Sequence, residues 1–494
     1  MERKSLKARI FGGVFWKFTE KTISQGMSFL ISIILARILL PEEYGIVAIV
    51  LVFITMANVF VTNGFGESLV QKKDADETDF STIFYCSLIL SMVLYLLIFI
   101  SAPAIAAFYK NEQLTGVLRV LAILLPVGSI NTIQQAYISK HMVFRKSFFS
   151  TLIGTLLSGG MGIWMAYQGF GIWSLVGQYL LYSIVETTVL FFIVDWRPKF
   201  KFSVNSAKAL IGFGWKLTAA QLINTGYAQL RTLLIGKVYS ATDLAYYNRG
   251  NQFPQLFITN VDSSISSVLF PAMSNCNSDV SEVKRLTRKS MRITAYVIFP
   301  LMAGLAAVAE PLVSLLLTDK WLFCVPFLKW GCLYFAMQPI QTANWQAIKA
   351  LGRSDICFKY EVIKKLLGIL LLIFTLKISV YAVAVTNGIM GILMALINMY
   401  PNQKLINYRY VEQFKDLLPS LLAAGLMGIC VSFLKFTSIS SGLLLIMQTV
   451  TGIVSYIFLS RILKIEEYQI LRKLLLKLLG TKRNKKEKTK SVIG

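Results

Sequence analysis

Positively charged side chains lie inside stretches of the sequence that are otherwise apolar. They are Lys17, Lys21, Arg119, Lys216, Arg231, Arg249, Lys329 and Lys349. A charged side chain at the centre of a lipid bilayer costs about 2.5–3.5 kcal/mol on insertion scales, so charges in such stretches are candidates for a functional site. We therefore expect these cations to face water or one another. Lys17, Lys216 and Lys349 have an alternative, because near the ends of their stretches they can extend to the membrane surface.

Hydrogen-bonding side chains accompany these cations at helical spacing. Glu20 lies beside Lys17 and Lys21, and the stretch 243–272 carries a polar stripe with steps of three and four residues. That stripe consists of Asn248, Gln252, Gln255, Thr259, Asp262 and Ser266. Similar stripes are formed by Thr218, Gln221, Thr225 and Gln229, and by Tyr334, Gln338, Gln341 and Trp345.

The chemistry of these groups suits a sugar that carries an anion. Amides and hydroxyls exchange hydrogen bonds with sugar hydroxyls, and an excess of cations suits pyrophosphate or an acidic sugar. The candidate substrate-cavity residues are Lys17, Glu20, Lys21, Arg119, Lys216, Arg231, Asn248, Arg249, Gln252, Asp262, Lys329 and Gln341. The alternative is that the polar stripes only join neighbouring helices. We assign no catalytic residue and no metal ligand.

The composition excludes an ordinary soluble domain. Of 494 residues, 55% are hydrophobic and 15% are charged, whereas soluble proteins have about 25% charged residues. A net charge of +25 would suggest nucleic acid as the partner of a soluble chain, but the long apolar runs argue against it and we expect no nucleic-acid partner. Six scattered cysteines without a C-x-x-C pair, and one histidine, offer neither a zinc site nor a disulfide framework.

The apolar runs predict an all-α polytopic membrane protein, because a membrane-spanning helix needs about 20 mostly apolar residues. We expect about fourteen spans, at 11–38, 45–66, 80–107, 114–138, 147–168, 171–194, 208–236, 243–272, 293–318, 322–350, 357–376, 379–400, 414–435 and 440–462. Connections on the side of the N-terminus hold most of the 50 Lys and Arg residues. By the positive-inside rule, this places both termini in the cytoplasm.

An internal repeat relates two parts of the chain. Residues 16–19 (WKFT) recur as residues 215–218 (WKLT), and weaker matches follow in the same order downstream. Spans one to six are therefore repeated in spans seven to twelve, which predicts two pseudo-symmetric six-helix lobes around a central cavity, with two extra helices at the end. We expect lobes at 1–200 and 201–405, the last two spans within 406–464, and an amphipathic stretch with a basic cytoplasmic tail at 465–494.

Three segments resemble a known family of transporters. They are residues 35–45 (LARILLPEEYG), residues 69–73 (LVQKK) and residues 169–176 (GFGIWSLV). They resemble the polysaccharide exporters, or Wzx-type flippases, of the multidrug/oligosaccharidyl-lipid/polysaccharide exporter superfamily. The likeness covers the first twelve spans, and the Pro-Glu-Glu-Tyr-Gly segment is its most specific part.

The resemblance implies a flippase of the bacterial inner membrane. Such proteins move undecaprenyl-pyrophosphate-linked oligosaccharide units to the periplasmic leaflet by alternating access of two lobes, and they use cations in the central cavity. The implied partners are the lipid-linked oligosaccharide and membrane lipids, with a polysaccharide polymerase and glycosyltransferases left open. No cofactor is implied, and coupling to a proton or sodium gradient stays open, with Glu20 and Asp262 as the acids to test.

Two other functions stay open at this point. A small-molecule or peptidoglycan-precursor transporter of the same superfamily would have the same architecture. A membrane glycosyltransferase or polymerase is less favoured, because the outer connections are short and no acidic pair or histidine-containing group lies near one to activate an acceptor. We therefore do not expect an enzyme.

Overall fold

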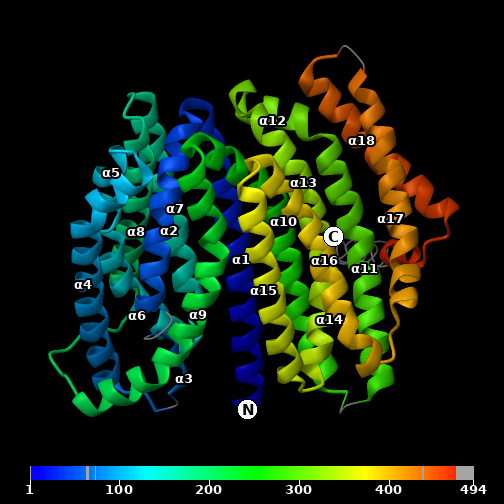
Figure 1. Cartoon of the computed structure of the whole chain (residues 1–494). Coiled ribbons are helices and arrows are strands. Elements are labelled where there is room, and N and C mark those ends of the chain that lie inside the picture. The colour runs from blue at the N-terminus through cyan, green and yellow to red at the C-terminus, as the bar shows by residue number, and fades with distance from the viewer. Residues whose placement is uncertain (1, 63–65, 73, 277–278, 437–438, 474–494) are drawn as a thin grey trace, which may run out of the picture. The chain divides into compact units, whose positions relative to one another are not determined.

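The structure is a computed structural model that describes residues 2–62, 66–72, 74–276, 279–436 and 439–473. Every regular element in this part of the chain is helical, which confirms the predicted all-α fold (Figure 1). The contacts divide the chain into two compact units, Met1–Asn248 and Arg249–Gly494. The basic tail predicted within 465–494 lies, after residue 473, outside the described residues.

Unit 1 contains the first nine helices and the first residues of the tenth. Their bounds are α1 Glu2–Ile38, α2 Pro41–Thr62, α3 Gly66–Gln71, α4 Glu77–Tyr109, α5 Gln113–Leu121, α6 Leu124–His141, α7 Phe144–Tyr167, α8 Ile172–Ile193 and α9 Val204–Val238. Helix α10 (Ala241–Ser274) begins in this unit and continues into unit 2. Unit 1 thus includes α9, which the repeat assigns to the second lobe; the lobe boundary at residue 200 stays a prediction.

Unit 2 contains the rest of α10 and the helices that follow it. Their bounds are α11 Val280–Ala307, α12 Ala309–Leu317, η1 Asp319–Cys324, α13 Val325–Ala336, α14 Gln338–Ala350, α15 Ser354–Leu376, α16 Val380–Leu405, α17 Tyr410–Phe433, η2 Leu434–Phe436 and α18 Ser441–Ile462. Helices α17 and α18 pack on one another, and α17 packs along α11 (Figure 1).

Ten helical segments among the described residues are long and apolar enough to cross a membrane. Ten of the fourteen expected spans coincide with them, and the chain is a multi-pass membrane protein. The other four expected spans are also helical, as α1, α9, α15 and the pair α13 and α14. Polar and charged side chains lower the hydropathy of α1 and α9, and a group of charges interrupts α15. Helices α13 and α14 are each too short because the helix is interrupted before Pro339.

The segments that carry the family resemblance meet in unit 1. Pro41 begins α2, and the Glu43 carboxylate accepts a hydrogen bond from the Leu40 N–H at 2.7 Å, which satisfies one of the free donors at this helix start. A Cβ at Gly45 would overlap the backbone of Ala241, so only glycine permits this close approach. Gly171, just before α8, has a positive φ of 54°, and a Cβ there would lie 2.5 Å from Glu43 Oε1. Two distant motifs therefore form one junction.

Buried polar contacts hold the helices of unit 2 together. The Tyr456 hydroxyl donates to the Tyr296 carbonyl at 2.7 Å, and Tyr296 bonds the Ser460 hydroxyl at 3.1 Å. The Asn402 amide donates to Asn344 Oδ1 at 2.8 Å and ties α16 to α14. Each bond satisfies groups that lipid could not, so α18 is fixed to α11 by specific partners and not by hydrophobicity alone.

Candidate functional site

Glu20 lies on α1 in a polar contact with α7. Its Oε1 atom accepts hydrogen bonds from the hydroxyls of Ser147 (2.9 Å) and Thr151 (3.3 Å). The Glu20 side chain is only 13% exposed, and Lys17 Nζ lies 3.9 Å from its Oε2 atom. The Lys17 side chain is 58% exposed, so it neutralises the acid weakly.

A second acid, Glu186 on α8, shares the same threonine. Thr151 Oγ1 lies 3.2 Å from Glu186 Oε1 and 3.3 Å from Glu20 Oε1. One hydroxyl has one hydrogen, so it can donate to only one carboxylate at a time. Two carboxylates around one hydroxyl repel each other unless one of them is protonated or a cation lies between them.

The sequence analysis missed Glu186. The signal was present, because Glu186 is the one acidic residue in the predicted span 171–194. Its partners Thr151 and Glu20 lie on other helices, and a pattern along one helix could not place them together. The arrangement of three helices, α1, α7 and α8, creates the acid pair.

The predicted cations of unit 1 have different surroundings. On α5, the Arg119 Nε donates to the Phe99 carbonyl at 3.2 Å, and its guanidinium lies 4.4 Å from the Phe99 ring centroid. This contact with α4 explains Arg119 without a ligand. Lys216 is exposed on α9, whereas Lys21, Arg231 and Asn248 are half-buried.

In unit 2, Asp262 on α10 accepts hydrogen bonds from α14. Thr342 Oγ1 donates to Asp262 Oδ1, and Gln338 Nε2 donates to Oδ2 at 3.4 Å. The neighbouring Gln341 donates to the Gly391 carbonyl of α16 at 3.3 Å. The polar stripes predicted on 243–272 and 322–350 thus contact each other here, and part of their polarity joins helices.

Arg249 is a packing residue of unit 2. It is 5% exposed, its Nη1 donates to Gln252 Oε1 at 2.8 Å, and its guanidinium lies 5.0 Å from the Trp321 ring centroid. These contacts join α10 to η1 and account for a buried cation. Its place in a substrate cavity stays a prediction.

The surroundings of Lys329 differ from the ring contacts of Arg119 and Arg249. It is exposed on α13 and lines a pocket of about 220 Å³ whose other walls are mostly apolar, including Phe299 of α11 and Leu421 of α17. Among the residues that the structure describes, no group of three His, Cys, Asp or Glu side chains could hold a metal ion. The twelve candidate residues come from both units, and their assembly into one cavity stays a prediction.

Comparisons with known proteins agree with this architecture. A family model described as polysaccharide biosynthesis protein matches residues 34–326. The teichuronic acid biosynthesis protein TuaB of Bacillus subtilis is 23% identical over 411 residues, which is 82% of this chain and 85% of TuaB. The succinoglycan biosynthesis transport protein ExoT of Rhizobium meliloti is 25% identical over 351 residues, 71% of each chain. The lipopolysaccharide biosynthesis protein WzxC of Escherichia coli is 23% identical over 367 residues, 74% of this chain and 75% of WzxC.

Two solved structures show the fold. The lipid II flippase MurJ in an inward closed conformation has a TM-score of 0.74 at 16% identity and covers 94% of this chain and 100% of its own. An inward-facing multidrug resistance transporter of the MATE family, in the MOP superfamily, has a TM-score of 0.61 at 16% identity and covers 78% of this chain and 94% of its own. At these identities the likeness concerns the fold alone.

Proposed function

The chain belongs to the polysaccharide biosynthesis protein family, and we propose on this premise that it is a flippase for undecaprenyl-pyrophosphate-linked oligosaccharide repeat units. It carries these units from the cytoplasmic to the outer leaflet for the synthesis of a surface polysaccharide. One observation carries the proposal: relatives named as polysaccharide transport and biosynthesis proteins align with most of the chain.

The mechanism that this fold supports is alternating access of two lobes. The internal repeat of spans one to six in spans seven to twelve supports two lobes with the substrate between them. Interior cations such as Lys21, Lys216 and Arg231 neutralise the pyrophosphate, and amides such as Asn248 exchange hydrogen bonds with the sugar hydroxyls. Positioning and charge are sufficient for translocation, so the proposal includes no covalent chemistry, no cofactor and no catalytic residue.

The acid pair on α1 and α8 is the proposed coupling site. Glu20 and Glu186 share one hydroxyl, and a bound proton or Na⁺ would relieve their repulsion. Asp262 is the alternative acid, but its donors Thr342 and Gln338 are not shared with a second carboxylate among the described residues. A gradient of protons or sodium would then drive the cycle through the occupancy of the Glu20–Glu186 pair.

The distribution of Lys and Arg among the connections supports an orientation in the membrane. We place it in the bacterial inner membrane with both termini in the cytoplasm, which the excess of Lys and Arg in the connections on that side supports. Its partners are the lipid-linked oligosaccharide and membrane lipids, together with the glycosyltransferases that supply the unit and the polymerase that consumes it.

The test is export in the source bacterium after deletion of the gene. Complementation with Lys216→Gln and Arg231→Gln, singly and combined, is expected to lower surface polysaccharide while the lipid-linked unit accumulates inside. A charged hydrogen bond contributes about 1.5–3 kcal/mol, so each loss reduces substrate affinity roughly ten- to a hundredfold. Arg353→Gln is the matched control, because Arg353 is exposed and pairs with Asp355.

Two results would redirect the proposal. If every cavity variant, including the combination, exports the polysaccharide fully, the assignment of these cations to substrate binding is wrong. The peptidoglycan-precursor alternative would be favoured by two results together. The chain would replace a missing lipid II flippase, and deletion of its gene would leave surface polysaccharide unchanged.

A further inference from the structure

The chain turns sharply after α18 and continues as a short helix over residues 466–473. The turn is closed by the Ile465 N–H, which donates to the Ser460 carbonyl at 3.0 Å, and it places Lys464 at a positive φ of 50°. The helix is held against α11 through its acids: Arg292 contacts Glu466 at 2.9 Å and Glu467 at 2.6 Å. The two negative charges of this segment are therefore both paired with Arg292.

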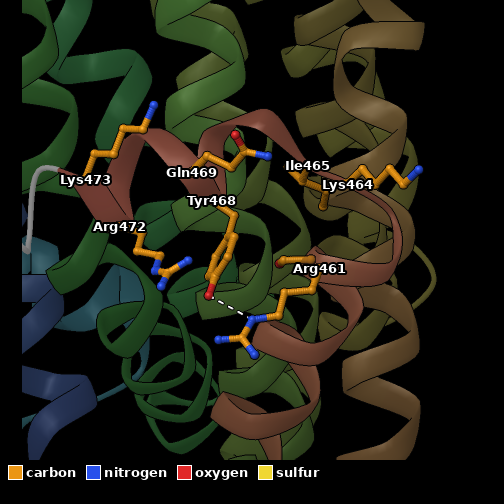
Figure 2. Close-up of a pocket in the computed structure, with 8 residues that line it drawn as sticks. Arg461, Lys464, Ile465, Tyr468, Gln469, Arg472 and Lys473 are labelled. Atoms are coloured by element: carbon orange, nitrogen blue, oxygen red, sulfur yellow. Dashed lines mark hydrogen bonds between the residues drawn. The ribbon is translucent and has the colours of Figure 1, made fainter.

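The end of α18, the turn and the segment together line a basic pocket of about 470 Å³ (Figure 2). Residues 468, 469, 472 and 473 follow the helical period and lie on one face of the segment. Glu467 lies on the opposite face, and Glu466 lies at the edge of the pocket face, about one turn before Gln469. The lining residues are Ser460, Arg461, Lys464, Ile465, Tyr468, Gln469, Arg472 and Lys473. Four of these described residues are cations and none is a carboxylate.

The two arginines have the geometry of an anion site. Arg461 Nε donates to the Tyr468 hydroxyl at 2.9 Å, and its guanidinium lies 5.6 Å from the same ring. This bond fixes Arg461, leaves its terminal N–H groups available and directs the hydroxyl hydrogen of Tyr468 away from the guanidinium. In Figure 2, Arg461 and Arg472 point toward the same region beside Tyr468, while Lys464 and Lys473 extend at the edges. Forked guanidinium donors match phosphate oxygens.

The position of the pocket at the end of a membrane-spanning helix favours a lipid headgroup as the ligand. Helix α18 has 22 residues, which corresponds to about 33 Å of helix and to the hydrocarbon thickness of a bilayer. Its end, where the pocket lies, is therefore at the level of the lipid headgroups. Next to the pocket, Ile462 is 57% exposed and offers an apolar surface for an acyl chain.

We propose that the pocket of Arg461, Lys464, Tyr468, Arg472 and Lys473 binds the phosphate group of an anionic membrane lipid. The headgroup phosphate lies between the two guanidinium groups, and the lysines at the edges attract the lipid over a longer range. This site is independent of the transported substrate and does not rest on the proposed function.

The experiment measures lipid binding by the purified full chain. The protein in detergent is titrated with dioleoylphosphatidylglycerol or with dioleoylphosphatidylcholine, and bound lipid is counted by native mass spectrometry. We expect the natural chain to prefer phosphatidylglycerol, and Arg461→Gln/Arg472→Gln to bind it about tenfold more weakly or worse. Arg472→Gln alone, which keeps the Arg461–Tyr468 bond, is expected to lose part of the preference and serves if the double variant does not fold.

The matched control is Arg285→Gln/Arg353→Gln, which removes the same charge from two exposed arginines that pair with Glu282 and Asp355. It is expected to bind like the natural chain. An unchanged preference in the pocket variants, or an equal loss in the control, would overturn the proposal. Inorganic phosphate is the second arm: if it displaces phosphatidylglycerol at equal concentration, the ligand is the free anion and the assignment to a lipid is wrong.

Discussion

At the scale of single residues, the contacts of Thr151 single out two acids. Its hydroxyl lies within 3.3 Å of both Glu20 and Glu186, and it cannot donate to both. An ionised pair in this position is unfavourable unless a proton or a cation lies between the two carboxylates. The net charge of the two carboxylates therefore depends on whether a proton or a cation is bound between them.

The first prediction concerns Glu186→Gln. The amide keeps the size of the side chain and removes the repulsion with Glu20, so we expect the protein to fold with an equal or higher Tm. Transport is expected to continue at a low rate that no longer depends on the proton or sodium gradient. Transport into vesicles at several imposed gradients measures this, and an unchanged gradient dependence would remove the pair as the coupling site.

Single residues also show what a pattern along the chain can reveal. The cations inside apolar stretches were recognisable from composition, but Arg119 and Arg249 contact Phe99 and Trp321, respectively. Helical spacing gives the face of one helix, whereas the neighbour on that face depends on the packing of helices far apart in sequence. For the same reason the sequence analysis included Glu20 and missed its partner Glu186.

At the scale of elements, the junction between the start of α2 and the start of α10 depends on one glycine. A Cβ at Gly45 would overlap the Ala241 backbone, which no side-chain rotation can relieve. We expect Gly45→Ala to destabilise the protein by about 1–3 kcal/mol, measured as a lower Tm in detergent. Gly160→Ala on α7 is the control: a Cβ there meets nothing within 4 Å, and its Tm is expected to stay the same or rise.

The ion pairs of Arg292 hold the 466–473 helix against α11. Arg292 is the ion-pair partner of both Glu466 and the buried Glu467. Arg292→Gln leaves buried negative charge and is expected to cost about 1–3 kcal/mol of stability. The helix should then be cut faster by trypsin at Arg472 and Lys473, which mass spectrometry of the fragments detects. Equal cutting of the variant and the natural chain would show that other contacts hold the helix.

The start of α15 provides a prediction about pH. The hydrogen bond from Arg353 lowers the pKa of Asp355 to about 2. Burial acts in the opposite direction, and hydrogen bonds from backbone N–H groups add to the lowering. An acid with a lowered pKa stabilises the fold above its unfolded pKa, and this contribution is lost as the pH falls toward the folded pKa. The Tm difference between the natural chain and Asp355→Asn is thus expected to be constant down to about pH 5 and to shrink toward about pH 3. A difference that grows on acidification would contradict the pairing.

Most elements were predictable because apolar length alone defines a membrane helix. The exceptions have local causes: the expected span 114–138 is divided into α5 and α6 near Pro126, and the expected span 322–350 into α13 and α14 near Pro339. Both prolines were visible in the sequence, but a proline also occurs in continuous kinked helices. Whether the helix bends or stops is decided by the neighbours that satisfy the freed backbone groups.

At the scale of the whole molecule, the number of membrane crossings connects the charge pattern to the fold. Helices α13 and α14 count as one crossing in the expected fourteen, although each is short. If together they failed to cross, every later connection would change sides, and the basic residues near Arg409 and Arg461 would face outward. The positive-inside rule argues against that topology.

Single cysteines introduced into a variant without the six natural ones test this count. Asn111→Cys lies between α4 and α5, Lys435→Cys lies in η2 before α18, and Ser354→Cys begins α15. With fourteen crossings and a cytoplasmic N-terminus, a membrane-impermeant maleimide added to intact cells is expected to label the first two and not the third. If α13 and α14 together do not cross, residues 111 and 354 are labelled and residue 435 is protected. Protection of both 354 and 435 would instead indicate that α15 does not cross. In the sequence repeat the pair of α13 and α14 corresponds to α5 and α6, so the first outcome would also break the predicted repeat of spans one to six in spans seven to twelve.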